Sequence, residues 1–428
     1  MKELEKKYLE ELFVEYAKVN TRSDATNKQN IPTTPGQKVL AKKIVAKLKQ
    51  IGVDDAYYNE ASGFAIGYLA SNSSDKAITG VGFIAHLDTA DYPAENISPK
   101  VHPNYAGQPL TLNSDKNIVL DPKDFPKLKQ LVGQTLITSD GTTLLGTDDK
   151  AGIVAILGAL KYFKENPEVE HGDIYVGFGP DEEIGLGGKR FLATDFDVEF
   201  AYTLDNGQAG ELQYETFNAS QATIEIEGTA VHPGNAYKTL VNAVLIARDI
   251  LNELPKDEVP EKTKEREGFI LVTKADLQLD RATLELIIRD FDQIKFRQKE
   301  ELIQKIVAQC NAKLDRPRVK VTFEQQYENI ANTITKHPYV VNLALAAYKK
   351  LGLTPKIVPF RGGTDGNFIT QKGIPTPNLF NGGGNYHGRY EYVTSEQLLL
   401  TANTVVTIVK EHVRQTKSGR DERALDNI

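Results

Sequence analysis

A histidine and an aspartate two residues apart, His86 and Asp88 of HLDT, follow an apolar run at 78–85. In extended chain, residues two apart face the same way, so both side chains point together from the end of this predicted strand. The aspartate could hold the second ring nitrogen of a metal-bound histidine, or act beyond it. Because the pattern is short, His-x-Asp alone is more often a hydrogen-bonded turn than a metal site.

Four more carboxylates stand at the start or end of predicted elements. They are Asp148 in GTDDKAG, Glu182 and Glu183 in PDEEIGLGG, and Asp205 in TLDNG. An aspartate at a helix start is a common N-cap, and adjacent glutamates usually form a solvated turn. Here the glutamates and Asp205 each follow an apolar strand directly, at the edge where open α/β sheets bind ligands.

A late histidine, His387, completes the set in NGGGNYHG, where Gly382, Gly383 and Gly384 give the backbone conformational freedom. Two histidines with three or more carboxylates fit a hydrolytic centre of two metal ions roughly 3.5–4 Å apart. Mixed nitrogen and oxygen ligands suit zinc, with cobalt or manganese as substitutes. One carboxylate would have to bridge the two ions.

The elements that position these residues predict an α/β fold. Apolar runs at 78–85, 173–179 and 198–204 alternate with a helix at 150–164, which is typical of a largely parallel sheet. A polar, proline-rich stretch from 91 to 129 reads as a long surface excursion. Helices at 339–351 and 395–412 and strands at 356–360 and 377–380 continue the pattern near the C-terminus.

The pattern changes between about 216 and 328. Alternating strands at 221–228, 283–292 and 318–325 are mixed with helices, which predicts an α+β sandwich with one solvated sheet face. We therefore expect a discontinuous catalytic domain, 1–215 and 329–428, interrupted by an inserted lid domain, 216–328.

Composition narrows the function classes. The 428 residues carry 51 Lys and Arg against 58 Asp and Glu, a net charge of −7, which argues against nucleic acid as a partner. The single cysteine excludes an internal disulfide. The N-terminal residues have helical spacing rather than the apolar centre of a signal peptide, and no apolar run is long enough to cross a bilayer. We expect a cytoplasmic protein without a membrane partner.

Taken together, the motifs resemble one family. HLDT, LLGTDDKAG, PDEEIG, TLDNG, AVHPG, IIRDFD, RGGTDG and NYHG occur in this order along essentially the whole chain. The sequence resembles the di-zinc M20 metallopeptidases and, within them, the bacterial tripeptide aminopeptidases. The implied fold is a zinc-peptidase catalytic domain with a mostly parallel sheet and an inserted α+β lid.

The resemblance also implies roles for individual residues. His86 and Asp205 would bind one zinc ion, Glu183 and His387 the other, and Asp148 would bridge both. Glu182 would be the general base and Asp88 would orient His86. The peptide bond after the bridging aspartate, Asp148–Asp149, would be cis.

Three residues outside the ligand set would contact substrate. His232 of AVHPG, in the lid, would supply a donor to the oxyanion when the domains close. Arg289 of IIRDFD would clamp the substrate carboxylate, a task that suits a bidentate guanidinium. Arg361 of RGGTDG would line the same pocket. The structural alternatives are a surface-turn histidine for His232 and a sheet-face ion pair for Arg289.

The implied activity is release of the N-terminal residue from short peptides, chiefly tripeptides. Another M20-type hydrolase, namely a dipeptidase, a carboxypeptidase or an N-acyl amino acid amidohydrolase, would share the same ligands. A non-catalytic metal-dependent protein on the same fold is the alternative from another class. The lid's alternating strands offer an edge for pairing, which leaves monomer and homodimer open.

Overall fold

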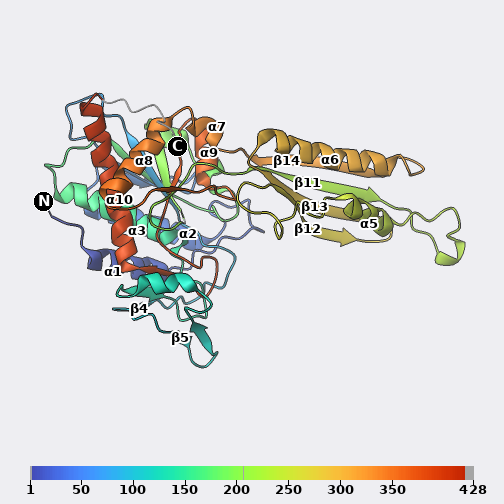
Figure 1. Ribbon diagram of the computed structural model, residues 1–428, viewed down its shortest axis with the longest axis horizontal. Coiled ribbons are helices and arrows are strands. Elements are labelled where there is room, and N and C mark those ends of the chain that lie inside the picture. The colour runs from blue at the N-terminus through green and yellow to red at the C-terminus, as the bar shows by residue number, and fades with distance from the viewer. Residues whose placement is uncertain (1, 206, 420–428) are drawn as a thin grey trace. The chain divides into compact units, whose positions relative to one another are not determined.

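The computed structural model describes residues 2–205 and 207–419, and the chain divides into two compact units. The main unit contains the chain up to Tyr214, residues 332–358 and the chain from Thr364. The inserted unit contains residues 215–331 and the short segment 359–363. Figure 1 shows the inserted unit with the labels β11 to β14, α5 and α6.

The main unit is built on one sheet. Within the described residues, eight strands follow the order β1-β2-β8-β3-β9-β16-β10-β15. Their bounds are Asp55–Tyr58 (β1), Ala65–Leu69 (β2), Ile174–Gly179 (β8), Val81–His86 (β3), Phe200–Leu204 (β9), Asn378–Leu379 (β16), Glu211–Gln213 (β10) and Lys356–Ile357 (β15). The central run β8-β3-β9-β16 is parallel, and the antiparallel pairs are β1-β2, β2-β8 and β10-β16. The predicted mostly parallel α/β fold is confirmed.

The central strands are buried on both faces. On β3, Phe83 lies among side chains of α3 (Thr147–Glu165), whereas its neighbour Ile84 packs with Phe191, Phe196 and Ile369. Successive side chains of a strand point to opposite faces, so an unbroken apolar run is what two covering layers require.

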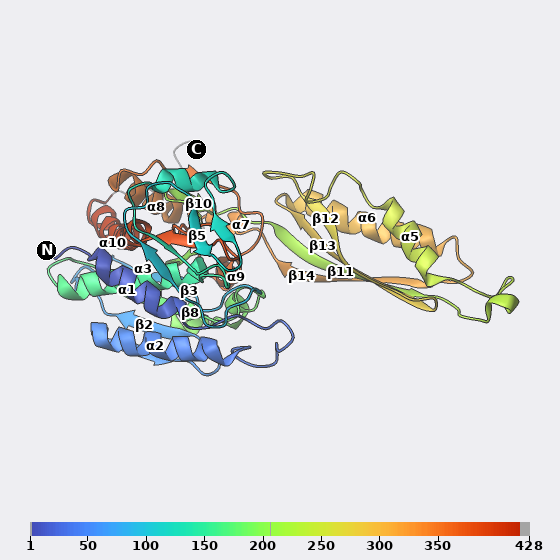
Figure 2. The ribbon, with the colours of Figure 1, turned by 90° about the horizontal axis from the view of Figure 1, so that it is seen from below.

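The covering helices come from distant parts of the chain. On the first face, α3 packs against α10 (Ser395–Lys417) and α1 (Lys6–Ala17). Figure 2 shows α2 (Pro35–Ile51) running beside β2. Two further helices, α8 (Pro338–Lys350) and α9 (Asp365–Gln371), contact β10 and β9. No helix in the described ranges combines the length and apolar character needed to span a membrane.

The excursion at 91–129 has more structure than its polar composition indicates. It contributes the strands β4 (Lys100–His102), β5 (Leu110–Asn113) and β6 (Ile118–Leu120). Beyond it, β7 (Leu136–Thr138) pairs with both β4 and β17 (Tyr392–Thr394). A small apolar cluster including Tyr105, Leu112 and Tyr392 holds these pieces together. The apolar residues of this core are spaced irregularly between prolines, so neither helical nor strand periodicity predicts it.

The inserted unit is a four-stranded antiparallel sheet with two helices on one face. The order is β12-β13-β11-β14, with bounds Phe269–Leu277 (β12), Arg281–Asp290 (β13), Asn218–Glu227 (β11) and Val319–Tyr327 (β14). Along β13 the residues alternate strictly, so Leu284, Leu286 and Ile288 pack beneath α5 (Ala243–Glu253) and α6 (Gln293–Asn311). The other face carries Glu285, Ile287 and Arg289, which is the amphipathic pattern of a half-buried sheet.

Candidate metal centre

The parallel register brings three site segments to one edge of the main sheet. His86 ends β3 level with Gly179 of β8, and the glutamates Glu182 and Glu183 follow directly after that strand. On the other side of β3, Ile84 is level with Thr203 of β9. His86 follows Ile84 by two residues and Asp205 follows Thr203 by two, so these side chains also come to the same level. The predicted meeting of these side chains at the carboxyl ends is what parallel pairing produces.

Asp148 enters the same place from the first turn of α3. Gly146, with φ of 83°, supplies the left-handed turn before it, and the Asp148–Asp149 peptide bond is cis. Gly152, one turn later, lies so near Leu204 that a Cβ would be 2.4 Å from its carbonyl oxygen. A glycine at that position lets the start of α3 approach the end of β9 closely.

Two histidines face the two oxygens of the Asp148 carboxylate. His86 Nε2 lies 2.8 Å from Oδ1, and His387 Nε2 lies 3.1 Å from Oδ2. His387 Nε2 is also 3.2 Å from Oε1 of Glu183, and His86 Nε2 is 4.0 Å from Oδ1 of Asp205. Each histidine thus shares Asp148 with one further carboxylate, which is the arrangement of a bridged pair of sites.

These side chains fit divalent metal ions. Ligand atoms of His86, Asp148 and Glu183 all lie within 4.8 Å of one another, and so do those of His86, Glu182 and Asp205. Oε1 of Glu183 is buried, with the imidazole Nε2 of His387 3.2 Å away. Nitrogen and carboxylate donors in such a cluster are the ligands that zinc and similar ions take.

The electrostatics of the cluster favour a cation. Burial raises the pKa of Glu182 and of Asp205 well above the usual carboxyl range, and the neighbouring carboxylates raise both further. Hydrogen bonds with Asp148 and Glu183 raise the pKa of His387 to about 11. A cation bound between such carboxylates stabilises their ionised forms, so this cluster favours cation binding.

Asp88 holds the loop that carries the two glutamates. Its fully buried carboxylate accepts hydrogen bonds from the main-chain N–H groups of Glu182 (2.9 Å) and Glu183 (3.1 Å). Nδ1 of His86 lies 3.0 Å from the main-chain oxygen of Asp88 and 3.4 Å from its carboxylate. Asp88 is therefore placed to orient His86 through its main chain and the glutamates through its side chain.

Comparisons with known proteins give the family. Residues 139–411 match peptidase family M20/M25/M40. Peptidase T of Fusobacterium nucleatum is 47% identical over 407 residues, which is 95% of this chain and 98% of that protein.

The chain belongs to peptidase family M20.

Two solved structures share its fold. A Staphylococcus aureus tripeptidase has a TM-score of 0.75 at 23% identity, covering 97% of this chain and all of that one. A dinuclear metal-binding M20 peptidase of Bacillus subtilis has a TM-score of 0.63 at 14% identity, covering 95% of this chain and 97% of that one. The predicted M20 metallopeptidase is confirmed.

Three residues predicted to contact substrate lie in the inserted unit of this M20 peptidase. His232 is exposed at the start of a short 3₁₀ turn, and its Nδ1 accepts a hydrogen bond from the N–H of Gly234 (3.1 Å). Arg289 donates to the main-chain oxygens of Ser220 and Ile288 and to Gln326, and it lies over the Tyr327 ring.

Arg361 has a structural task within the inserted unit. It donates to the main-chain oxygens of Glu265 and Glu267 and to the Thr263 hydroxyl, with its guanidinium over the ring of Phe217. These contacts hold the segment 359–363 in the inserted unit. Motif reading gave no sign of them, because the partners are main-chain atoms nearly 100 residues away.

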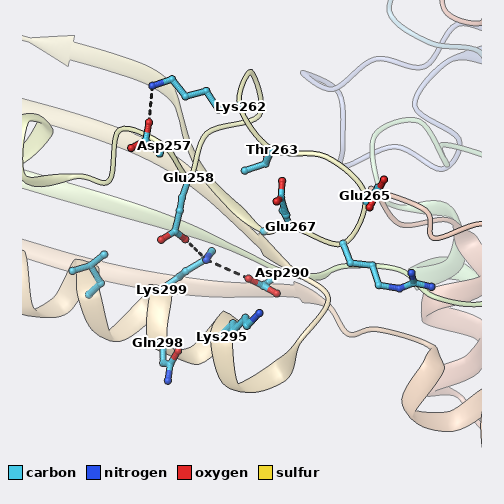
Figure 3. Close-up of a pocket in the computed structure, with 13 residues that line it drawn as sticks. Asp257, Glu258, Lys262, Thr263, Glu265, Glu267, Asp290, Lys295, Gln298 and Lys299 are labelled. Atoms are coloured by element: carbon cyan, nitrogen blue, oxygen red, sulfur yellow. Dashed lines mark hydrogen bonds and ion pairs between the residues drawn. The ribbon is translucent and has the colours of Figure 1, made fainter.

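The loop that Arg361 holds borders a charged cavity of about 890 Å³ (Figure 3). Lys299 lies between Glu258 and Asp290 there, 3.2 Å from the Asp290 carboxylate, and Lys262 pairs with Asp257. Lys262 and Lys299 are thus both held by carboxylates that line this cavity. Both metal-ligand groups found among the described residues lie in the main unit instead.

Three buried polar residues of the M20 site were not predicted to have a role. Asp149 accepts from the main-chain N–H of His86 (3.3 Å) and from Asn381 (3.2 Å). Asn378 accepts from the N–H of Asp205 (2.9 Å) and Asp365 accepts from that of Gly188. These residues hold the loops of the site through main-chain hydrogen bonds. Two of them lie within motifs of the sequence, Asp149 in DDK and Asp365 in RGGTDG.

Metal removal tests the centre. Dialysis against a strong chelator is expected to lower the midpoint of thermal unfolding, because the carboxylates then lose their counter-charge. Added Zn²⁺ at 100 times its dissociation constant should restore about 2.7 kcal/mol. Differential scanning calorimetry measures both changes. The variant Asp205→Asn should respond less to Zn²⁺; an equal response, or no response from the wild type, would contradict this placement of the centre.

Proposed function

We propose that this M20 peptidase is a tripeptide aminopeptidase that releases the N-terminal residue of short peptides at a two-metal centre. The names of its relatives, peptidase T and tripeptidase, support the activity. The observation that carries the two-metal centre is the Asp148 carboxylate, whose two oxygens each face a different histidine, His86 and His387.

The ligands divide into two sets around that carboxylate. His86 and Asp205 would hold one zinc ion, Glu183 and His387 the other, and Asp148 would bridge them, with Co²⁺ or Mn²⁺ as substitutes. When bound, the two ions lower the pKa of a water between them and polarise the scissile carbonyl. The distances of 3.1 Å and 3.2 Å from His387 Nε2 to Asp148 and Glu183 support the second set.

Glu182 is the general base. It takes a proton from the attacking water and passes it to the nitrogen of the leaving amine, so that no proton is lost. Its carboxyl group lies beside the proposed ligands, with an oxygen within 4.8 Å of the ligand atoms of His86 and Asp205. Asp88 supports this role by holding the main-chain N–H of Glu182 at 2.9 Å.

His232 and the two arginines bind substrate. With Nδ1 accepting from Gly234, the neutral His232 ring carries its proton on Nε2, which is the donor that a tetrahedral oxyanion needs. No Asp or Glu among the described residues forms an ion pair with Arg289, so its charge is available for a substrate carboxylate. Arg361 lines the same pocket while it holds the loop at 263–267.

The catalytic domain comprises residues 1–215 and 329–428. Residues 216–328 form the lid, whose closure around a peptide limits substrate length. The enzyme works in the cytoplasm on short peptides, as a monomer or homodimer, and binds neither nucleic acid nor membrane. The other M20 activities, dipeptidase, carboxypeptidase and N-acyl amino acid amidohydrolase, remain the alternatives, since metal ligands do not separate them.

A substrate panel separates these activities. The zinc-loaded protein is expected to cleave tripeptides with a free N-terminus faster than di- or tetrapeptides, and to leave N-acetylated tripeptides intact. Mass spectrometry of the products should identify the free N-terminal residue and the remaining dipeptide. Cleavage of N-acyl amino acids without cleavage of tripeptides would refute the aminopeptidase proposal.

The general base is tested by Glu182→Gln, which keeps the shape of the side chain and removes its basicity. We expect kcat to fall by about 10²–10⁴-fold while two metal ions per chain stay bound. Turnover and metal content are measured on the same sample. The exposed Glu60→Gln is the control, expected to leave both unchanged. Loss of metal together with activity would mean that Glu182 is a ligand instead.

The carboxylate clamp is tested by Arg289→Met with two versions of one tripeptide. For the free acid, kcat/KM should fall about 10- to 100-fold, as expected when a hydrogen-bonded charge pair is lost. For the C-terminal amide the wild type is already slow, and the variant should match it. The exposed Arg248→Met controls for the loss of a lid cation. An equal fall on both peptides would indicate a purely structural role.

A further inference from the structure

A buried carboxylate outside the ligand set, Glu391, binds the loop that carries Asp148. Glu391 is 1% exposed and directly precedes β17. Its Oε2 accepts hydrogen bonds from the N–H groups of Leu145 (2.9 Å) and Gly146 (2.7 Å), and its Oε1 accepts from that of Asp148 (3.0 Å). One side chain thus engages three main-chain donors of the 145–148 loop.

This arrangement requires an acid rather than an amide. Both oxygens of Glu391 act as acceptors towards N–H groups that cannot rotate away. A glutamine offers one acceptor and one NH₂ donor, so one of its ends would face main-chain donors without making a hydrogen bond. A buried donor left without an acceptor in that position destabilises the loop. The two acceptor oxygens of a carboxyl side chain are therefore tied to the geometry of the loop.

The same residue lies at the base of the loop that carries His387. Gly384 and Tyr392 exchange two main-chain hydrogen bonds of 2.9 Å and 3.0 Å, which form the base of a short loop with His387 within it. Glu391 lies at that base, and its N–H donates to the Gly388 carbonyl at 3.2 Å. Its side chain then reaches the 145–148 loop. The two segments that carry Asp148 and His387 are in this way joined by one carboxylate.

A buried lysine lies beside the same turn. Lys150 is fully buried, donates to the main-chain oxygen of Val19 (2.8 Å), and interacts electrostatically with Glu391. Its ammonium lies close to Gly146, where a Cβ would be 3.0 Å from Nζ. The turn at Gly146 is thus held by Glu391 and contacted by Lys150.

We infer that Glu391 is a positioning residue that holds Asp148 and His387 in their metal-binding arrangement before any metal binds. It touches neither substrate nor metal, and acts through the main chain of the 145–148 loop and through the loop at 384–392. The inference rests on the proposed two-metal function. Partners of this kind commonly change metal affinity 10–100-fold.

The test compares Glu391→Gln with a matched control, Glu411→Gln, a buried glutamate of α10 that pairs with Lys350 and Arg414. Zinc affinity is measured by competition with a chromophoric chelator, and Co²⁺-loaded protein gives a visible spectrum that reports coordination. Glu391→Gln should weaken zinc binding about 10- to 100-fold and change the cobalt spectrum, with kcat lowered more than KM is raised.

Glu391→Asp keeps two acceptor oxygens on a shorter side chain and should lie between glutamine and wild type. Glu411→Gln should lower thermal stability without changing zinc affinity or the cobalt spectrum. Wild-type affinity and an unchanged spectrum in Glu391→Gln would overturn the inference. A wild-type protein that binds no metal would instead overturn the proposed function, and the inference with it.

A measurement on the wild type covers the case in which the variants fail to fold. Hydrogen–deuterium exchange of metal-free protein reports on the amides of Leu145, Gly146 and Asp148. If Glu391 holds this loop in advance, these amides should be nearly as protected without metal as with it. Rapid exchange in the metal-free protein, with protection only after zinc is added, would show that the metal and not Glu391 orders the loop.

Discussion

Mutual repulsion among buried carboxylates is the constraint on which the arrangement of the main unit depends. Asp148, Glu182, Glu183 and Asp205 converge at the carboxyl ends of β3, β8 and β9, where few water molecules can solvate them. In such a place a carboxylate ionises only if donors or cations compensate it. The imidazoles of His86 and His387 lie against the Asp148 carboxylate, and bound metal ions would supply the remaining positive charge. The acidic excess of the sequence, net −7, is in part this cluster.

In the inserted unit, two cationic side chains, Lys299 and Arg289, have different kinds of partner. In the charged cavity of this unit Lys299 lies between the carboxylates of Glu258 and Asp290, whereas Arg289 is surrounded by carbonyl oxygens, an amide and an aromatic ring. Burial lowers the pKa of Arg289, yet a guanidinium stays protonated throughout the ordinary pH range. Neutral partners fix the position of this cation without neutralising it. A paired lysine stabilises a fold, and an arginine with neutral partners can still attract an anion.

The family, the mostly parallel fold and the metallopeptidase activity could all be predicted, because the functional residues of each motif lie close together in the sequence. HLDT and PDEEIG follow apolar runs that could only be central strands, and the register of β3 with β8 then brings them together. Tertiary contacts were not predictable in this way. β12 was missed, since FILVTKADL mixes apolar and charged residues on an edge, and so were β1 and β2. The contacts of Asp149 with His86 and the packing of 359–363 in the inserted unit were not predicted, because the partners are main-chain atoms distant in the sequence.

The order of the ligands along the chain has a consequence for biogenesis. His86 comes from the first quarter of the sequence and His387 from its last tenth, with the whole inserted unit between them. An unfolded or half-synthesised chain therefore offers only isolated weak ligands, and tight metal uptake has to wait until both ends of the main unit have met. Metal occupancy in a cell would then act as a record of completed folding: a truncated or misassembled chain stays empty, and so hydrolyses nothing.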